Sequence, residues 1–386
     1  MSAITDRVRV LVDQLTASGN LTDDRWRRAV NDTPRHLFIP NTALAAPFAE
    51  DAYVINREAA PDAWWNAVYS NTAIVTQLDD GATDITTGKG DYTCSSSAPG
   101  ILFDFLELLD PYDFDEVMEI GTGTGWTAAL LSARLSDDNI TTIEVDPQIA
   151  TDADKNLKAA GYSPRLITGD GAKGWPTGAP YDCVHVTCGV TDIPYSWIEQ
   201  TRPGGVIVLP WIPGYGDGHV VRLQVAGEIA VGRFYGGSNY MLMRAQRRNR
   251  PDNNSQPRIS STFLDPRRVT RSSWGADVAL AGMLPQVSRQ TADTTNEEGS
   301  TFDLWLWDDQ SSAHVTYSPE YKRSAVEQSG PRNLWDETES AYLQWVRWGS
   351  PARERFGMTV TPHGQHIWLD RPENVISLEN GRQRAK

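Results

Sequence analysis

A glycine-rich segment between an apolar run and a helical stretch constrains the fold of this chain most strongly. It reads Glu-Ile-Gly-Thr-Gly-Thr-Gly-Trp over residues 119–126 and continues the apolar run 117–120. Glycine lets the backbone turn tightly and approach a ligand without a clash from Cβ. The N-terminus of a following helix offers unpaired N–H groups to a carboxylate or a phosphate. We therefore expect a strand, a ligand-binding loop and a helix, in this order.

Acidic residues after the neighbouring apolar runs extend this interpretation. Glu144 lies 23 residues after Gly121, and a carboxylate at that place can accept hydrogen bonds from both hydroxyls of a ribose. Glu119 stands directly before the loop, where a carboxylate favours a cationic ligand, and Asp170 follows the third run. The pattern fits both dinucleotide enzymes and methyltransferases, but the G-x-G-x-G spacing and these carboxylates favour S-adenosyl-L-methionine. A glycine turn without a ligand is the alternative.

The chain around this segment alternates short apolar runs with helical stretches. Strands are predicted at residues 117–120, 141–145, 165–168, 183–186 and 206–209, and helices at residues 126–135, 147–160 and 194–200. This βαβ rhythm predicts an α/β fold with a mostly parallel sheet covered by helices.

The flanking regions show weaker patterns. The predicted elements are helices over residues 3–17, from Thr22 onward and after Pro99, a loop-like stretch over 56–92, a hairpin from 219–225 and 230–234 followed by 240–244, and a polar linker over 249–258. We expect a helical and substrate-loop region at 1–95, the cofactor-binding core at 96–248, and a C-terminal extension at 249–386.

The charge of the chain is unevenly distributed. The 386 residues contain 35 Lys and Arg against 50 Asp and Glu, which gives a net charge of -15, and the whole surplus lies in residues 1–150. Such a region repels nucleic acid, because phosphate binding requires cations. The start of the chain has no apolar signal core, and no apolar run approaches the roughly 18 residues of a membrane span. We expect a soluble, cytoplasmic protein that binds neither nucleic acid nor membrane, as a monomer or weak oligomer.

Cysteine and histidine patterns do not predict a metal or a nucleophile. The three cysteines lack metal-ligand spacing. His363 and His366 have no acidic or cysteine cluster nearby, and Cys94 has no base partner in the sequence. The tryptophans of the C-terminal extension are expected to be mostly core residues.

Several segments resemble, in order, the motifs of protein-L-isoaspartate O-methyltransferases. They are residues 33–40 (TPRHLFIP), 49–53 (AEDAY), 95–99 (SSSAP), 119–126, 169–171 with 175–176, and 202–205. The SSSAP segment resembles the active-site signature T-I-S-x-P of that family. The resemblance covers about residues 20–245.

This resemblance implies a Rossmann-like class I S-adenosylmethionine-dependent methyltransferase fold. It also implies methyl transfer to a peptide carboxylate, with S-adenosyl-L-homocysteine as product. Ser97 matches the active-site serine, with Ser95 and Ser96 as helpers; an N-cap of the following helix is the alternative role of these serines. The cofactor residues implied are Glu119, Gly121, Thr122, Gly123, Thr124, Gly125, Trp126, Glu144, Val145, Asp170 and Gly171.

Departures from the family pattern point to an unusual substrate. Gly100 replaces the His or Tyr that often follows the proline, and 38 residues separate Tyr53 from Tyr92 where repair enzymes have a much shorter connection. The C-terminal extension, expected to be an α+β peptide-recognition domain, resembles that of methyltransferases encoded beside ribosomal-peptide maturation enzymes, including graspetide systems. That resemblance implies methylation of an aspartate in a modified, acidic precursor peptide, followed by succinimide (aspartimide) and isoaspartate formation.

Three other functions are retained as alternatives. They are general repair of isoaspartyl proteins, a non-catalytic peptide-binding homologue, and a nicotinamide oxidoreductase. Between Arg244 and Arg271, eight arginines face two aspartates. Arginines such as Arg267, Arg268 and Arg271 could contact an acidic peptide, and a solvated basic surface is the alternative.

Overall fold

The structure is a computed structural model that describes residues 3–247, 256–296 and 299–378. It divides the chain into two compact units. The first unit contains the chain up to Cys188 together with residues 194–209 and 224–228. The second contains residues 189–193, 210–223 and the described residues from Ile229 onward. The predicted division into residues 1–95, 96–248 and 249–386 stays a prediction.

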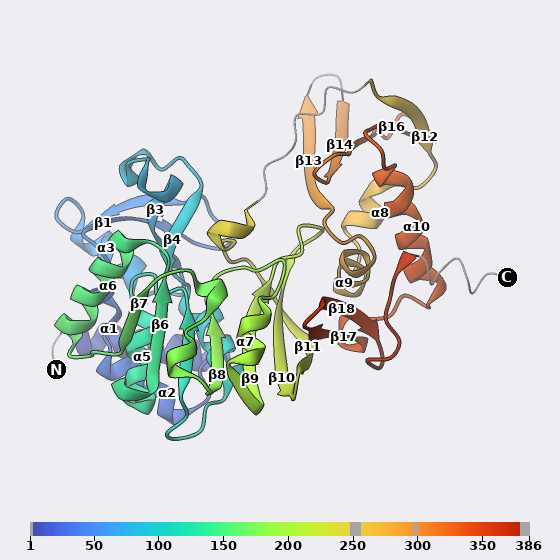
Figure 1. Ribbon diagram of the computed structural model, residues 1–386. Coiled ribbons are helices and arrows are strands. Elements are labelled where there is room, and N and C mark those ends of the chain that lie inside the picture. Colours follow the sequence, from blue (N-terminus) through green and yellow to red (C-terminus); the bar gives the residue numbers. More distant parts are fainter. Residues whose placement is uncertain (1–2, 248–255, 297–298, 379–386) are drawn as a thin grey trace. The chain divides into compact units, whose positions relative to one another are not determined.

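A parallel sheet forms the centre of the first unit (Figure 1). Its strands are ordered β9-β8-β5-β6-β7, and every neighbouring pair among them is parallel. The strands are β5 (Val117–Ile120), β6 (Ile140–Glu144), β7 (Arg165–Thr168), β8 (Tyr181–Val186) and β9 (Thr201–Trp211). This arrangement confirms the predicted α/β fold with a mostly parallel sheet.

The helices of this sheet follow local sequence signals closely. They are α4 (Pro99–Leu109), α5 (Trp126–Leu135), α6 (Pro147–Ala160) and α7 (Tyr195–Glu199). In α6, the N-cap Asp146 accepts hydrogen bonds from the backbone N–H groups of Gln148 and Ile149, and Gly161 ends the helix in a left-handed conformation. Because such caps are encoded locally, the predicted bounds of α5 and α6 coincide with the observed ones.

An antiparallel sheet precedes this core, with the strand order β2-β1-β3-β4. The elements of this region are α1 (Ala3–Ala17), α2 (Asp24–Asp32), β1 (Thr42–Ala46), β2 (Tyr53–Asn56), α3 (Pro61–Val68), β3 (Ala73–Leu78) and β4 (Tyr92–Ser96). The predicted helices near the start are confirmed. The loop-like interpretation of residues 56–92 is wrong, because α3 and β3 lie within this stretch.

The loop prediction is wrong because the buried residues of this stretch stand among residue types that are typical of turns. Trp64 and Val68 of α3 are buried, as are Ile74 and Val75 of β3. These short apolar pairs stand between Asn, Asp and Gly residues. Only their burial in the folded unit, in α3 and in β3, distinguishes them from the apolar residues of a loop.

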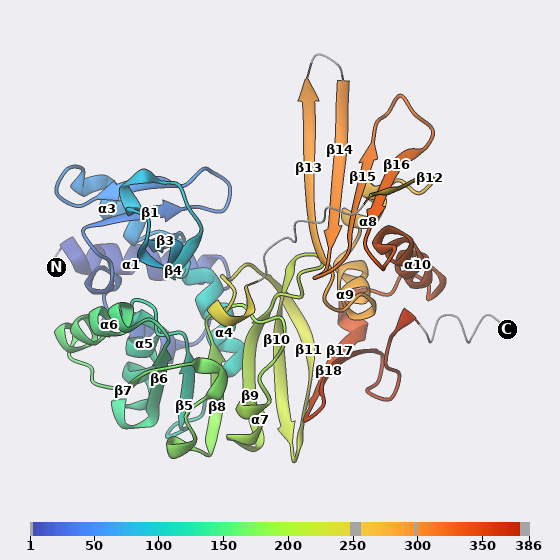
Figure 2. The ribbon, with the colours of Figure 1, turned by 45° about the horizontal axis from the view of Figure 1, so that its top comes forward.

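The second unit contains an antiparallel sheet of five strands in the order β12-β16-β15-β14-β13 (Figure 2). The strands are β12 (Arg258–Thr262), β13 (Ser288–Asn296), β14 (Gly299–Trp307), β15 (Ser312–Tyr317) and β16 (Ser324–Ser329). The helices are α8 (Pro266–Thr270), α9 (Trp274–Met283) and α10 (Leu334–Arg347). Helix α10 packs on β14, β15 and β16. The predicted C-terminal α+β region is thus present.

The remaining strands are β10 (Gly218–Ala226), β11 (Ile229–Ser238), β17 (Phe356–Thr361) and β18 (Gly364–Leu369). Strands β10 and β11 confirm the predicted hairpin. The strand predicted at residues 240–244 is wrong, since Leu242 makes only an isolated bridge to Gly189. Of the predicted linker 249–258, residues 249–255 lie outside the described residues, and Arg258 already begins β12.

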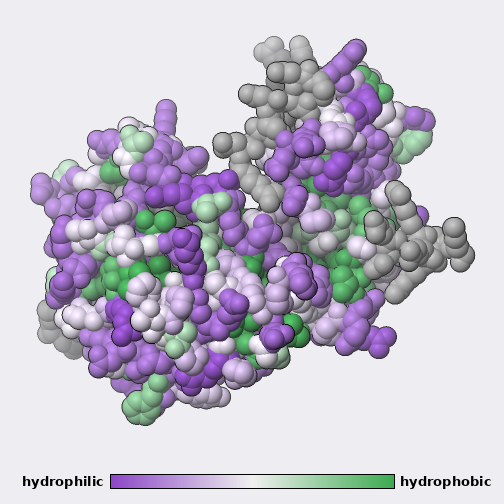
Figure 3. Space-filling view, in the orientation of Figure 1, coloured by the Kyte–Doolittle hydropathy of each residue, from purple (hydrophilic) through white to green (hydrophobic). Residues whose placement is uncertain are grey.

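Short 3-10 helices complete the described chain. They are η1 (Arg35–Phe38), η2 (Asp79–Gly81), η3 (Ile85–Thr87), η4 (Asp137–Asn139), η5 (Gly171–Lys173), η6 (Pro176–Gly178), η7 (Arg244–Gln246) and η8 (Arg353–Arg355). Figure 3 shows a surface on which hydrophilic residues predominate and hydrophobic ones form separate patches. Within the described ranges, no helix has both the length and the apolar character needed to cross a membrane.

Candidate active site

The glycine loop connects β5 to α5 and contains three glycines with positive φ. The φ angles of Gly121, Gly123 and Gly125 are 97°, 54° and 90°, a region that side chains with Cβ rarely adopt. A Cβ added to Gly121 would lie 2.6 Å from Oγ1 of Thr187, and one added to Gly123 would lie 3.3 Å from the carbonyl oxygen of Ser95. The glycines are therefore required both by conformation and by close neighbours.

Glu144 ends β6 beside this loop and is buried. Its carboxylate accepts hydrogen bonds from the backbone N–H of Gly123 at 2.9 Å and from that of Asp146 at 3.0 Å. Burial raises the pKa of Glu144, while these N–H bonds lower it. The predicted ribose-binding carboxylate and the predicted glycine loop therefore lie together.

Glu119 of β5 is fully buried and only half of its carboxylate is bonded. Its Oε2 accepts a hydrogen bond of 2.6 Å from Thr142, whose hydroxyl contacts that of Thr122, also at 2.6 Å. Its Oε1 has no hydrogen-bond partner among the described residues. Burial raises the pKa of Glu119 to about 8. A buried acceptor without a partner costs free energy, so this oxygen is suited to a polar or cationic ligand.

The other predicted cofactor residues lie at the same ends of the parallel strands. Val145 directly follows β6 and is 44% exposed. Asp170 follows β7, is exposed, and accepts a hydrogen bond from the backbone N–H of Ala172. Gly171 is buried, and a Cβ there would lie 2.7 Å from Cγ2 of Ile120. Ligands of open α/β sheets bind at these carboxyl ends, so the sheet brings the predicted set together.

The serine segment lies at the end of β4 and borders the glycine loop through Ser95. Ser95 and Ser97 are half-buried and Ser96 is buried. The Ser96 hydroxyl accepts a hydrogen bond of 3.3 Å from Nε of Arg35. No hydrogen bond from the Ser97 hydroxyl to another described residue is present, and the N-cap of α4 is Ala98, which makes no side-chain cap bond. Ser97 is therefore not the N-cap of α4, which was its alternative role.

Arg35 is the principal residue that sequence reasoning missed. It is fully buried, and burial lowers the pKa of its guanidinium to about 9. Five backbone carbonyl oxygens accept hydrogen bonds from it, and they belong to Val68, Ser70, Thr72, Ser96 and Ser97. Its guanidinium also lies 5.1 Å from the ring centroid of Trp126 at the start of α5. The signals in the sequence were a cation at the start of the short apolar turn 35–39 and its place in the family-like segment 33–40.

The position of Gly100 has a direct structural cause. The backbone N–H of Gly100 donates a hydrogen bond of 2.7 Å to Oδ1 of Asn71, and a Cβ at Gly100 would lie 2.7 Å from Nδ2 of the same side chain. Asn71 belongs to the long connection between Tyr53 and Tyr92. The connection between Tyr53 and Tyr92 therefore occupies the space where a side chain after the proline would lie.

The titratable groups His36 and Cys94 are held by pairing and by burial. His36 pairs with the Tyr69 hydroxyl at 2.7 Å. Burial raises the pKa of the Cys94 thiol to about 12, which keeps it protonated. Among the described residues, no group of three His, Cys, Asp or Glu side chains is arranged to hold a metal ion.

The three arginines singled out in the C-terminal extension lie together in the second unit. Arg267, Arg268 and Arg271 line a pocket of about 460 Å³ with Asp265 and Tyr342. Two of these cations are already paired. Nη2 of Arg267 lies 2.7 Å from Asp265, and Arg271 forms an ion pair with Asp293. No ion pair of Arg268 with a described residue is observed.

Comparison with known proteins agrees with this geometry. The profile of the family described as protein-L-isoaspartate(D-aspartate) O-methyltransferase (PCMT) matches residues 6–224. The protein-L-isoaspartate O-methyltransferase of Methanopyrus kandleri is 31% identical over 238 residues, which are 60% of this chain and 88% of that protein. That of Pyrococcus horikoshii is 32% identical over 200 residues, 52% of this chain and 74% of that protein.

A solved structure named protein-L-isoaspartate O-methyltransferase shows that the likeness extends to the fold. It has a TM-score of 0.55 and 19% sequence identity, and covers 94% of this chain and 100% of that chain. The shared fold thus reaches beyond residues 6–224 and confirms the predicted class I methyltransferase architecture. The chain belongs to the protein-L-isoaspartate O-methyltransferase family, and it is a carboxyl O-methyltransferase that uses S-adenosyl-L-methionine.

Proposed function

We propose that this enzyme methylates the free carboxylate of isoaspartyl residues in polypeptides, as a repair methyltransferase does. In an isoaspartyl residue the backbone runs through the side-chain carbonyl, which leaves the α-carboxylate free. The family profile and the names of the curated relatives support this substrate. They favour general repair over the ribosomal-peptide substrate that the C-terminal extension led us to expect. Membership of this enzyme family also argues against the oxidoreductase and non-catalytic alternatives.

One structural relationship carries the proposal, namely the contact of the serine segment with the glycine loop. The carbonyl oxygen of Ser95 lies 3.3 Å from the place of a Cβ on Gly123. Ser97 follows two residues later with a half-buried hydroxyl. A carboxylate that accepted a hydrogen bond from Ser97 would therefore lie next to the loop that holds the cofactor.

The residues of this loop region fit S-adenosylmethionine. Glu144 and Asp170 are the carboxylates for the hydroxyls of the ribose and the edge of the adenine. The Oε1 of Glu119, buried without a partner among the described residues, suits a polar or cationic ligand. The Cβ-free surface of Gly121 and Gly123 permits close approach of the ligand to the backbone. When bound, the cofactor supplies an electrophilic methyl group on a sulfonium.

Methyl transfer to a carboxylate requires little proton transfer by residues of the enzyme. A carboxylate with a reference pKa of roughly 4 is ionised near neutral pH and is already a nucleophile. Ser97 orients it by donating a hydrogen bond to one oxygen, and the other oxygen is then free to attack. Positioning of this kind can contribute roughly 7–11 kcal/mol. The backbone amide that follows the ester can later expel methanol and close a succinimide without an enzyme residue.

A matched pair of peptides tests the proposal. One peptide carries an isoaspartyl residue and the other a normal aspartyl residue in the same sequence. Incubation with the full chain and methyl-labelled cofactor should yield base-labile methyl ester on the isoaspartyl peptide only. Labelling of both peptides alike, or of neither, would overturn the assignment.

A specific observation keeps a modified ribosomal peptide as the second candidate. Strand β3, which belongs to the long connection between Tyr53 and Tyr92, pairs with β4 directly at the serine segment, with Ile74 opposite Ser96 and Val75 opposite Ser95. Asn71 additionally adjoins Gly100. The two departures from the family pattern named in the sequence, Gly100 and the long connection, thus lie beside the serines, which supports a substrate other than an ordinary isoaspartyl site. The C-terminal fold does not discriminate between the candidates, because the solved chain named protein-L-isoaspartate O-methyltransferase aligns with 94% of this chain.

Mass spectrometry of a precursor peptide encoded by a gene next to that of this enzyme tests the second candidate. The mature, modified peptide should gain one methyl group and then lose methanol after incubation with enzyme and cofactor. An unchanged mass of that peptide, with turnover of the isoaspartyl peptide, would exclude it.

A further inference from the structure

Helix α10 covers one face of the five-stranded sheet of the second unit. On β14, Phe302, Leu304 and Leu306 are buried on the side where α10 packs, while the alternating residues Thr301 and Trp305 are only half-buried. Side chains alternate between the two faces of a strand. The half-buried residues therefore belong to the face that α10 leaves uncovered.

A trough lies on this face, with a volume of about 900 Å³. Its floor takes one residue from each of four neighbouring strands, namely Ser261, Ala325, Thr316 and Thr301. The register places Ser261 opposite Ala325 and Ala325 opposite Thr316. Thr316 lies opposite Asp303, and Thr301 follows two residues away on the same face of β14. Pockets of about 300–1,000 Å³ are typical of ligand sites, so the trough is large enough for a bound segment of chain.

Two aromatic side chains rise from the rim of the trough and remain uncovered. Phe263 is 72% exposed and Tyr321 is 69% exposed. The guanidinium of Arg323 lies 3.9 Å from the ring centroid of Phe263 and donates a hydrogen bond of 3.2 Å to Ser261. Aromatic and arginine side chains at a concave surface are the residues that most often carry binding energy.

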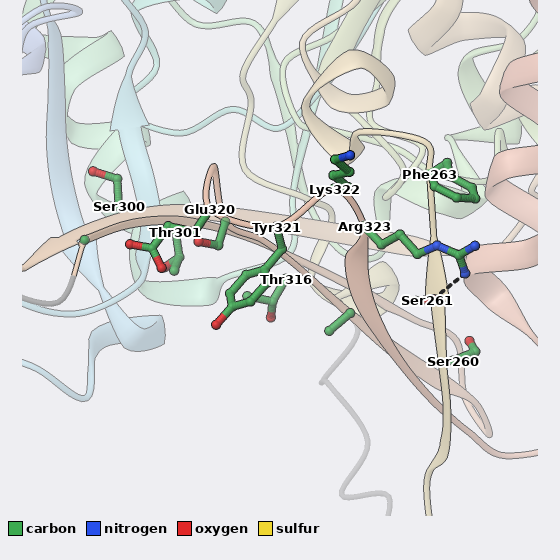
Figure 4. A pocket seen from close by; sticks show the side chains of 13 residues that line it. Ser260, Ser261, Phe263, Ser300, Thr301, Thr316, Glu320, Tyr321, Lys322 and Arg323 are labelled. Atoms are coloured by element: carbon green, nitrogen blue, oxygen red, sulfur yellow. Dashed lines mark hydrogen bonds between the residues drawn. The ribbon is translucent and has the colours of Figure 1, made fainter.

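The charges of the trough are separated along its length. Figure 4 shows Arg323 beside Phe263 at one end, and Glu320 with Ser300 and Thr301 at the other. Neither Lys322 nor Arg323 forms an ion pair with any residue in the described ranges. These cations are thus available to a carboxylate from another molecule, in contrast to Arg267 and Arg271 near α8.

We propose that this trough binds an acidic, extended segment of the polypeptide substrate, separate from the residue that is methylated. Carboxylates of the segment pair with Lys322 and Arg323, apolar side chains cover Phe263 and Tyr321, and the hydroxyl-lined floor bonds the peptide backbone. The inference rests on the proposed function only in taking a polypeptide as substrate. It gives the C-terminal unit the role of a docking site for that substrate.

Two isoaspartyl peptides and matched variants of the full chain test the docking site. The short peptide has about six residues around the isoaspartyl site, and the long one adds about fifteen residues that contain Glu, Asp and Phe. Phe263→Ala, Tyr321→Ala and Arg323→Glu should each raise KM for the long peptide about tenfold, or about 1.4 kcal/mol. They should leave KM and kcat for the short peptide unchanged. Phe114→Ala, which alters an aromatic residue of the first unit that is 85% exposed, is the control.

The outcomes separate the docking site from the proposed chemistry. Equal KM values of wild type and variants for the long peptide would overturn the docking site, even with normal methyl transfer. If neither peptide is methylated, the docking site is tested by binding alone. Fluorescence anisotropy then measures the affinity of the full chain for the labelled acidic segment of the long peptide. Binding that Arg323→Glu weakens and Phe114→Ala leaves intact supports the trough, and binding insensitive to both variants, or absent, refutes it.

Discussion

The guanidinium of Arg35 donates a hydrogen bond of 2.9 Å to the carbonyl oxygen of Ser97, a residue 62 positions later in the chain. The same group bonds the carbonyl oxygen of Ser96 at 3.2 Å and lies against the ring of Trp126. One buried cation therefore connects the serine segment with the helix that follows the glycine loop. It contacts the serine segment through carbonyl oxygens and the helix through the Trp126 ring, and none of its observed bonds is to a carboxylate.

Replacement of this cation should destabilise the whole first unit. Arg35→Met leaves several buried carbonyl oxygens unsatisfied, at about 1–3 kcal/mol each. We expect a loss of at least about 3 kcal/mol in the free energy of unfolding, measured with urea. Arg35→Lys should recover only part of this loss, because a lysine lacks the planar fork of donors. Arg28→Met at an exposed site is the control, with a change within about 0.5 kcal/mol. Equal values for Arg35→Met and Arg28→Met would contradict this role.

Removal of the Ser97 hydroxyl should affect the reaction and spare cofactor binding. Ser97→Ala deletes a proposed donor to the substrate carboxylate, so kcat on the isoaspartyl peptide should fall about 100-fold, as for the loss of one preorganised donor. The Kd of S-adenosylmethionine, measured by calorimetry, should change less than about threefold. Ser96→Ala is the comparison, and it should lower stability by about 1 kcal/mol through its lost bond to Arg35. Parallel losses of kcat and cofactor affinity in Ser97→Ala would show a structural role.

A methyl group in the glycine loop should abolish cofactor binding. Gly121→Ala combines a φ of 97° with a Cβ only 2.6 Å from Oγ1 of Thr187. Gly161→Ala has a similar φ of 88° but no atom within 4 Å of the new Cβ. Both variants bear the conformational cost of about 1 kcal/mol, and only Gly121→Ala should lose cofactor affinity in calorimetry. Retention of normal affinity by Gly121→Ala would place the ligand elsewhere.

The buried Glu119 predicts a pH dependence of stability in the cofactor-free protein. Its pKa rises from 4.5 to about 8 on folding. Between these values the folded state holds a proton that the unfolded state releases. The contribution of Glu119 to stability is therefore present at low pH and lost as the pH rises through 8, with a slope of up to about 1.4 kcal/mol per pH unit. Urea unfolding from pH 5 to 8 should show this slope in the difference between wild type and Glu119→Gln. Parallel curves would contradict it.

The arginines near α8 should contribute unequally to any contact with an acidic peptide. Arg267 and Arg271 are already paired with Asp265 and Asp293. Of the three arginines, Arg268 is therefore the most available for an ion pair with a carboxylate of the peptide. Arg268→Gln should weaken binding of an acidic peptide by about two- to fivefold at low ionic strength, and the difference should vanish in high salt. Unchanged affinity at low salt would identify the stretch as ordinary solvated surface.

Elements that depend on local sequence signals, chiefly those of the parallel core, were predicted correctly. Elements that depend on pairing with distant segments of the chain were predicted wrongly. The bounds of α5 and α6 follow from Gly125, Pro147 and Gly161, which act within a few residues of themselves. Strand β3 was missed because its short apolar run has meaning only beside β1 and β4. The strand predicted at residues 240–244 failed for the opposite reason, since its apolar residues find one bridge and no continuous partner strand.

The sequence by itself determined the chemistry that the loop region can support. The alternation of strands and helices in the sequence is enough to place certain residues at one edge of a parallel sheet. They are Glu119, the three glycines, Glu144 and Asp170. Tertiary structure alone decided what surrounds that edge. It buried Arg35 beneath Ser97, set Asn71 against Gly100 and left Phe263 uncovered over the trough. Such contacts join residues distant in sequence, where no local pattern records which partner a buried cation or an exposed ring will have.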